Sequence, residues 1–191
     1  MVTVSTSKSY HHGDLRTALL EAGLKALESN AAEDISLRQI AREVGVSATA
    51  VYRHFPDKAA LMAALAQAGI EQMAAWQSAE AARADPDSAF AATGRAYVRW
   101  ALANPALFRL VFGECKGVGQ TVFGDNAAAT LLRTFAQDLT PDEPGAQRLM
   151  IQAWAVVHGL AMLMLDGQLP ADDTLIDRVI DARTLFPASP R

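Results

Sequence analysis

The chain has 191 residues, of which 51% are hydrophobic, and a formal net charge of −4 at pH 7. That length suits one ordinary domain or a small domain joined to a larger one, and the dominance of Ala and Leu over β-branched and aromatic runs favours an all-α fold. The single cysteine, Cys115, excludes an internal disulfide framework and suits a reducing cytoplasm.

The charges are unevenly distributed along the chain. Between Ser36 and Lys58 there are four Lys or Arg residues against two Asp or Glu, whereas from Leu61 onward there are ten against fourteen. A local basic patch on an acidic body is compatible with DNA binding at one end of the molecule. An architectural DNA-binding protein would need broad basicity, which the acidic body lacks.

Neither a secretion signal nor a membrane span is predicted. Polar Ser, Thr, Lys and His residues dominate the chain before Leu15. The longest uncharged apolar run, residues 149–165, contains Gln152 and His158 and is shorter than the about 20 apolar residues that a spanning helix needs. We interpret it as a buried helix of a protein without a membrane partner.

Local signals predict four helices in the first part of the chain. Ser36 and Gln39 form a capping-box pattern at the start of the second helix, and Gly45 ends that helix because a left-handed turn residue is best tolerated as glycine. Pro56 and Asp57 stop the third helix and cap the fourth. The four helices are predicted at residues 13–29, 37–44, 48–55 and 58–82.

Five further helices are predicted in the rest of the chain. Asn104 and Pro105 have the pattern of an N-cap followed by proline at the first helical position. Residues 113–124 form a glycine-rich connector. The five helices are predicted at residues 90–101, 105–112, 125–138, 143–168 and 174–185.

The second and third predicted helices form a helix-turn-helix, because a short glycine-containing turn joins them. Apolar positions such as Ile40, Val51 and Phe55 can face one core with the first helix, which leaves the outer side of the third helix free. In such a motif the later of the two helices, here the third predicted helix, contacts base edges in the major groove through its N-terminal residues. A three-helix core whose polar residues merely solubilise it is the alternative reading.

The order of residues in "SATAVYRHFPDK" supports the DNA-binding reading. Its first three residues are small and permit a close approach to base edges. The long side chains that follow can reach phosphates on the groove walls, and the start of the fourth helix can add N–H groups and a lysine. The residues concerned are Ser47, Ala48, Thr49, Tyr52, Arg53, His54 and Lys58.

These residues resemble the tetracycline-repressor (TetR) family of bacterial regulators. The segment "ISLRQIAREVGVSATAVYRHFPDKAALMAAL", residues 35–65, is similar to that family's DNA-binding signature, and "YHHGDLRTALLEAGLKAL" from Tyr10 resembles the first helix of one branch. "WAVVHGL", residues 154–160, is similar to the Trp-His-Gly (WHG) signature of one C-terminal subtype. The resemblance implies a three-helix DNA-binding domain at residues 1–60 and a larger helical domain for ligand binding and dimerisation at residues 61–191.

The resemblance also assigns individual DNA contacts. Ala48 departs from the family pattern, since several members carry a longer polar residue there, and this affects the base preference. The positions that match DNA-contacting residues are Arg38, Ser47, Thr49, Tyr52, Arg53, His54 and Lys58.

The last two predicted helices are expected to pair with those of a second copy, as in the family. Residues 143–168 are apolar on most faces, more than one intramolecular core requires, and Leu175, Ile176, Val179 and Ile180 offer a second stripe. A large monomeric core is the alternative. A dimer would place two recognition helices about 34–36 Å apart in successive turns of the major groove.

Aromatic residues spread over the C-terminal domain suggest a pocket for a small apolar or aromatic effector, although simple core packing is the plainer reading of each. Tyr97, His158, Arg99 and Gln152 are candidates for the polar groups that would orient it. The predicted ligand-binding residues are Trp76, Tyr97, Trp100, Phe108, Phe112, Trp154, His158 and Met162.

Signs of catalysis, metal binding or a cofactor are weak. Glu-x-x-His pairs are missing, and "GVGQTV" at Gly117 lacks the third glycine and the strand of a dinucleotide motif. Cys115, beside Lys116, is either a redox-sensing thiol or an ordinary loop cysteine. His11 and His12 have no matching zinc ligands.

The sequence thus predicts a cytoplasmic, homodimeric transcriptional regulator, most simply a repressor that leaves its operator when an effector binds. We expect no enzymatic activity, cofactor or metal. A helical small-molecule carrier or enzyme without a DNA role is the alternative hypothesis.

Overall fold

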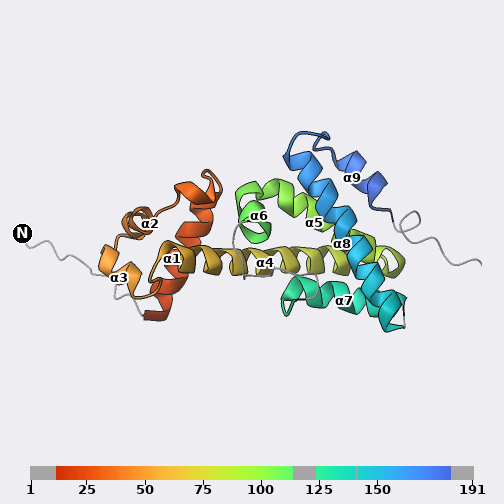
Figure 1. Cartoon of the computed structure of the whole chain (residues 1–191), viewed down its shortest axis with the longest axis horizontal. Coiled ribbons are helices and arrows are strands. Elements are labelled where there is room, and N and C mark those ends of the chain that lie inside the picture. Colours follow the sequence, from red (N-terminus) through yellow and green to blue (C-terminus); the bar gives the residue numbers. More distant parts are fainter. Residues whose placement is uncertain (1–11, 114–123, 141, 182–191) are drawn as a thin grey trace, which may run out of the picture. The chain divides into compact units, whose positions relative to one another are not determined.

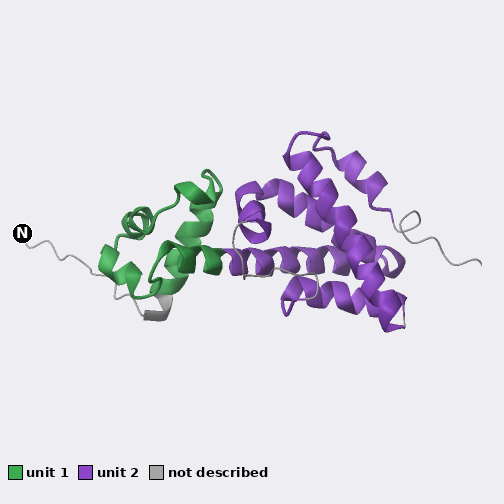
Figure 2. Cartoon of the chain, viewed as in Figure 1, with its two compact units in different colours: residues 1–65 green, residues 66–191 purple. Residues whose placement is uncertain are grey.

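The computed structural model describes residues 12–113, 124–140 and 142–181, and within these ranges every regular element is helical (Figure 1). The chain divides into two compact units, residues 1–65 and 66–191 (Figure 2). The all-α expectation is therefore confirmed.

The N-terminal unit is a small helical bundle. It contains α1 (His12–Leu27), the 3-10 turn η1 (Ala32–Asp34), α2 (Leu37–Val44), α3 (Ala48–Tyr52) and the first turns of α4 (Lys58–Arg83). Helix α2 packs against both α1 and α3. Each helix contributes apolar side chains to one core, whose buried members include Leu19, Leu27, Ile35, Ile40, Val51, Phe55, Leu61 and Leu65.

Side-chain caps hold the short helices of this unit. The Ser36 hydroxyl oxygen accepts a hydrogen bond from the N–H of Gln39 (3.2 Å), as one half of the predicted capping box requires. Gly45 has φ 77° and ψ 31°, a left-handed conformation that reverses the chain after α2 at little cost only for glycine. The Asp57 carboxylate accepts from the N–H of Ala60 (2.7 Å) and caps α4.

The third helix is shorter than predicted. Helix α3 ends at Tyr52, and the N–H groups of His54 and Phe55 both donate to the carbonyl oxygen of Val51 at 2.9 Å, which closes a turn. Pro56 accounts for the early end, because its ring disfavours helical backbone at the residue before it. The prediction that the helix continues to Phe55 is therefore wrong.

The C-terminal unit is built around α5 and α8. It contains most of α4, the 3-10 turn η2 and five further helices, and α8 packs against both α5 and α7. Helix α5 also contacts α6 and α9. The further elements are η2 (Pro86–Ser88), α5 (Ala89–Ala103), α6 (Pro105–Phe112), α7 (Ala127–Leu139), α8 (Glu143–Leu165) and α9 (Asp173–Val179).

Three sequence-based details of this unit need correction. Pro105 does open α6, but the Asn104 side chain makes no capping bond to that helix and instead donates to the Trp100 carbonyl oxygen at the end of α5 (3.0 Å). Helix α8 ends at Leu165 rather than at residue 168, because Gly167 (φ 69°) turns the chain. Helix α9 ends at Val179, and residues 182–185 of the predicted helix lie outside the described ranges.

Helix α8 is the one helix of the described ranges that is long and apolar enough to cross a membrane by length and composition. It also supplies buried residues to the core of its unit, among them Leu149, Val157, Leu160 and Met164. Because its inner face packs against α5 and α7, we interpret α8 as a core helix, as expected from the sequence.

Candidate nucleic-acid interface and aromatic cluster

Helix α3 presents one buried and one exposed side, as the helix-turn-helix prediction requires. Val51 is completely buried and Phe55, just beyond the helix, is 2% exposed, so both fix the segment from behind. Ser47, Thr49, Tyr52 and Arg53 are exposed. Ala48 and His54 are half-buried, and Arg38 on α2 is exposed.

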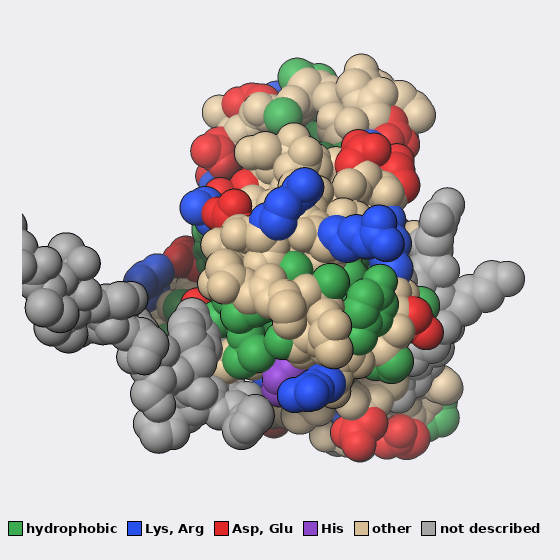
Figure 3. All heavy atoms as spheres, turned by 90° about the vertical axis from the view of Figure 1, so that its left-hand side faces the viewer, with side chains coloured by type: hydrophobic (Ala, Val, Ile, Leu, Met, Phe, Trp, Pro, Cys, Tyr) green, Lys and Arg blue, Asp and Glu red, His purple; other side chains and the backbone are tan. Residues whose placement is uncertain are grey.

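The exposed surface of this unit carries uncharged, basic and acidic side chains. Figure 3 shows Lys and Arg side chains near hydrophobic and uncharged ones on the face to which α2 and α3 belong, with Asp and Glu side chains at its edges. The residues at the start of α3 are small, and Ser47 and Thr49 among them are exposed. The Ser47 hydroxyl oxygen accepts from the N–H of Ala50 (3.2 Å), so Ser47 caps the helix while its O–H can still donate to a base or phosphate.

Lys58 has a structural role that the sequence did not indicate. Its ammonium group donates to the carbonyl oxygen of Glu33 at 2.5 Å, which joins η1 to the start of α4. A lysine ammonium has three donors, so this contact orients the charge and leaves two N–H groups for a phosphate.

A cluster of aromatic rings surrounds His158 in the C-terminal unit. Trp154 stacks on the His158 imidazole with ring centroids 4.7 Å apart and an interplanar angle of 16°. The Phe112 and Phe108 rings lie 5.1 and 5.5 Å from it, and the Tyr97 hydroxyl is 2.9 Å from His158 Nδ1. Helices α5, α6 and α8 therefore meet at one aromatic cluster, which consists of Tyr97, Phe108, Phe112, Trp154 and His158.

Burial sets the protonation of the Tyr97–His158 pair. It raises the pKa of the Tyr97 hydroxyl far above its usual value of 10, while a hydrogen bond from the Trp154 side chain lowers that pKa by less. Burial also lowers the pKa of His158 below its usual 6.5, so the imidazole is neutral at pH 7. The Tyr97 hydroxyl and His158 Nδ1 share one hydrogen bond, and which of them donates depends on the imidazole tautomer.

The lowered pKa of His158 predicts acid sensitivity of this unit. An unfolded histidine binds a proton near pH 6.5 while the folded one resists it, so stability is full above that pH and is lost as the pH falls below it. We expect Tm to drop between about pH 7 and pH 5, and His158→Gln to make the drop smaller. Thermal unfolding at both pH values tests this, and an equal drop in the two proteins would contradict it.

The other predicted ligand residues make no ring contact with His158 among the described residues. Trp100 is 1% exposed, whereas Trp76 on α4 is 39% exposed. Met162 is half-buried on α8, one helical turn beyond His158. Gln152 is exposed. Five of the eight predicted residues are thus brought together.

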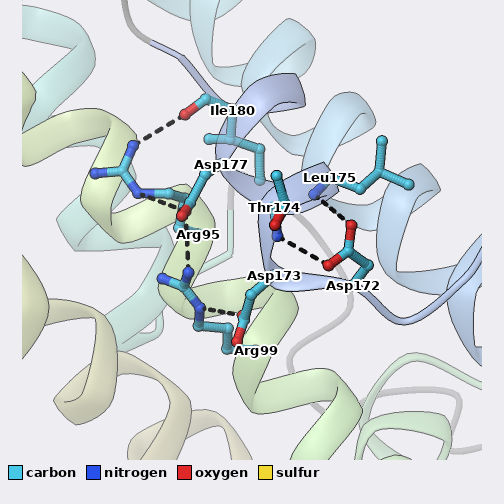
Figure 4. Close-up of polar contacts among 8 residues, drawn as sticks. All are labelled: Arg95, Arg99, Asp172, Asp173, Thr174, Leu175, Asp177 and Ile180. Atoms are coloured by element: carbon cyan, nitrogen blue, oxygen red, sulfur yellow. Dashed lines mark hydrogen bonds and ion pairs between the residues drawn. The ribbon is translucent and has the colours of Figure 1, made fainter.

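Arg99 takes part in an ionic network instead. It donates to the carboxylates of Asp173 (2.8 Å) and Asp177 (2.9 Å), while Arg95 donates to the carbonyl oxygen of Ile180 (3.0 Å) and lies 3.6 Å from Asp177 (Figure 4). The hydrogen bond with Asp173 is the main cause that raises the pKa of Arg99. The network fastens α9 to α5, and its sequence signal was the four-residue spacing of both the arginines and the aspartates.

No group of three or more metal-ligating side chains occurs in the part of the chain that the structure describes. Cys115, the Gly117 segment and His11 lie outside that part.

A left-handed glycine turn between two short capped helices, with an exposed and partly basic outer face, defines a helix-turn-helix DNA-binding module. A family model described as bacterial regulatory proteins, tetR family, matches residues 19–65, and one described as tetracyclin repressor-like, C-terminal domain, matches residues 90–183. The chain belongs to the TetR family of transcriptional regulators, which are not enzymes. Membership implies operator DNA and an effector as partners.

Solved structures share this fold. A protein of unknown function from Rhodococcus sp. RHA1 is 31% identical with a TM-score of 0.75, over 94% of this chain and 97% of that one. A tetR-family regulator from Streptomyces coelicolor has 19% identity and a TM-score of 0.65, over 91% and 80% of the chains. NalD, the secondary repressor of the MexAB-OprM multidrug efflux pump in Pseudomonas aeruginosa, has 22% identity and a TM-score of 0.56, over 91% and 94%. The last two show the fold alone.

The nucleoid occlusion factor SlmA of Marinomonas sp. (strain MWYL1) is 44% identical over 52 residues, which are 27% of this chain and 26% of that protein. The chain therefore matches about a quarter of the length of this curated relative.

Proposed function

We propose that this regulator is a cytoplasmic repressor that binds its operator through residues 1–60 and releases it when a small aromatic or apolar molecule binds within residues 61–191. The observation that carries the DNA-binding half is the exposed face of α3, held from behind by the buried Val51 and Phe55. Arg38, Ser47, Ala48, Thr49, Tyr52, Arg53, His54 and Lys58 are the proposed DNA contacts.

Within this surface, the place of each residue on its helix determines whether we expect it to contact a base or a phosphate. Thr49 lies on the first turn of α3, where side chains meet base edges, whereas Tyr52 is at its end and Lys58 begins α4. Thr49→Ala should therefore change which base is preferred at one position of the operator. The difference in binding free energy between the preferred base and the others should change by about 1–3 kcal/mol. Tyr52→Phe and Lys58→Ala should instead weaken binding by a similar factor on all sequences.

Random-site selection with the wild-type protein, followed by gel-shift titration of the three variants on the selected and on altered duplexes, measures both effects. Selective binding that weakens with salt supports a regulator. A wild-type protein that selects no sequence, and does not bind DNA beside its own gene, would favour the helical carrier instead. If all three variants bound DNA like the wild type, the proposed placement of α3 in the major groove would be wrong.

The aromatic cluster supports the effector half of the proposal. Tyr97, Phe108, Phe112 and Trp154 surround His158, whose Nε2 has no hydrogen-bond partner among the described residues. A planar apolar molecule that carries one hydrogen-bonding group could pair with that nitrogen. The WAVVHGL segment supplies both Trp154 and His158, which favours the Trp-His-Gly subtype for this C-terminal domain.

Fluorescence titration of Trp154 with a panel of aromatic compounds tests the effector half. His158→Gln and Tyr97→Phe should reduce any affinity found. We propose that the outlying Trp76, Trp100 and Met162 complete the site only when the effector is bound. A folded protein that responds to no compound would count against this half.

We further propose that the homodimer forms through α8 and α9. Ile151, Ala155, Gly159 and Leu163 follow one another at four-residue spacing on α8. Ile151 and Leu163 are 48% and 39% exposed, and a side chain placed at Gly159 would meet no atom within 4 Å. A row of apolar and small residues is what two helices need to pack closely.

Gly159→Glu is expected to separate the protomers without unfolding them, because the protomer has room for the side chain and a helix prefers most residues to glycine. Light scattering should show the mass of a protomer for this variant at concentrations where the wild type is dimeric. The exposed Gln137→Glu on α7 adds the same charge elsewhere and should remain dimeric. A dimeric Gly159→Glu protein would exclude this row as the interface.

A further inference from the structure

Arg16 of α1 is a cation that lies beside the recognition segment, by which we mean α3 and the turn after it, residues 47–55. Its guanidinium carbon is 5.3 Å from the centroid of the Phe55 ring, in a cation–π contact. Figure 1 shows the start of α1 close to α3, in agreement with this contact. The first helix therefore brings a positive charge to the turn that follows α3.

The contact with the ring leaves the hydrogen-bond donors of the guanidinium unused. An arginine stacks on a ring through its flat face, and its five N–H donors point outward along its edge. Arg16 is exposed, and it forms no ion pair with a carboxylate of the described residues. Those donors are thus available to an anion from outside the protein.

The ring that Arg16 contacts is buried and belongs to the recognition segment. Phe55 is 2% exposed, and its backbone N–H donates to the carbonyl oxygen of Val51 inside α3 (2.9 Å). Arg53 and His54, two proposed phosphate contacts, lie on the same turn. Arg16 therefore lies beside the turn whose residues would contact the DNA backbone.

We propose that Arg16 is a further DNA contact, which donates to a backbone phosphate next to the one bound by the Arg53–His54 turn and is held in place by Phe55. This rests on the proposed DNA-binding function and adds to it a contact from the first helix. The ligand is a phosphate diester oxygen, for which the planar fork of arginine is well suited. The contact carries no sequence information.

Arg16→Ala is expected to weaken binding several-fold, by the same factor on the duplex obtained by random-site selection and on an unrelated duplex. Loss of one phosphate contact should also reduce the slope of log K against log salt concentration by about 0.9 for each bound protomer. A merely structural role would lower Tm and leave that slope unchanged. Thermal unfolding of each variant separates the two.

Two conservative changes keep the proposal open to test if Arg16→Ala is unstable. Arg16→Lys keeps the charge but not the flat stacking face, so the salt slope should stay near the wild-type value while affinity falls. Phe55→Leu keeps an apolar core residue and removes the ring, and should have the same effect. The double variant Arg16→Ala/Phe55→Leu should bind no worse than Arg16→Ala alone, because both changes remove one interaction.

Arg83→Ala is the matched control, since Arg83 is an exposed arginine at the end of α4 in the other unit and lies on neither of the helices proposed to form the dimer. It removes an equal charge and should leave the salt slope unchanged. If the wild type binds selectively and Arg16→Ala has the wild-type affinity and slope, Arg16 is not a DNA contact and the regulator assignment stands. If the wild-type protein binds neither duplex, the DNA-binding function fails and this contact fails with it.

Discussion

Phe108→Ala is expected to lower the free energy of unfolding of the C-terminal unit by about 3–5 kcal/mol. Phe108 is completely buried, and its ring centroid lies 4.9 Å from that of Phe112 and 5.8 Å from that of Tyr97. Removing the ring deletes these contacts and leaves a cavity beside His158, which neighbouring helices can only partly close. Urea denaturation followed by circular dichroism measures the loss.

The same variant distinguishes a packed core from an open effector site. Leu139→Ala, on an exposed residue of α7, serves as the control and should change stability by no more than about 0.5 kcal/mol. Benzene should stabilise Phe108→Ala by filling the new cavity. A loss below about 1 kcal/mol would contradict the expectation, since it would mean that the ring already borders open space.

Phe55→Ala is expected to have the largest effect in the N-terminal unit, with a loss of about 3–5 kcal/mol. The Phe55 ring is 2% exposed and carries the Arg16 guanidinium on one face. A unit of this size has a limited core and little stability to spare. We therefore expect α3 to lose its fixed position, so that selective DNA binding disappears altogether.

Chemical denaturation and gel-shift titration together test this second expectation. Tyr52→Ala is the matched control, because Tyr52 is 45% exposed and its removal should weaken DNA binding while leaving stability within about 0.5 kcal/mol. If Phe55→Ala remained as stable as the wild type, Phe55 would not be the anchor that its burial indicates. If it were unstable but still bound selectively, the recognition surface would lie elsewhere.

The helix-turn-helix could be read from the sequence because its signals are local. Ser36 and Asp57 satisfy N–H groups three residues ahead, Gly45 allows a left-handed turn, and Pro56 restricts the residue before it. Each of these effects acts within one helical turn. The predicted bounds of α2 were right for this reason. The end of α3 was harder to predict, because Phe55 continues the apolar helical pattern while Pro56 disfavours helix at that residue.

The aromatic cluster could be predicted only in part. The sequence indicated that Tyr97, Phe108, Phe112, Trp154 and His158 belong to the interior, because they lie on apolar helices. It could not indicate that these five meet while Trp76 faces outward, since that depends on how each helix is rotated about its axis. A periodic pattern with several apolar faces does not fix this rotation.

The sequence by itself determined the fold class, the family and the turn chemistry of the DNA-binding segment. Only the tertiary structure decided which side chains distant in the chain are partners: Tyr97 with His158, 61 residues apart, Arg99 with Asp173, 74 residues apart, and Lys58 with the carbonyl of Glu33. Caps and turns are settled by neighbouring backbone atoms, whereas these contacts exist only after the helices have packed. The Arg16–Phe55 contact belongs to the second kind, which is why the sequence alone left Arg16 without a role.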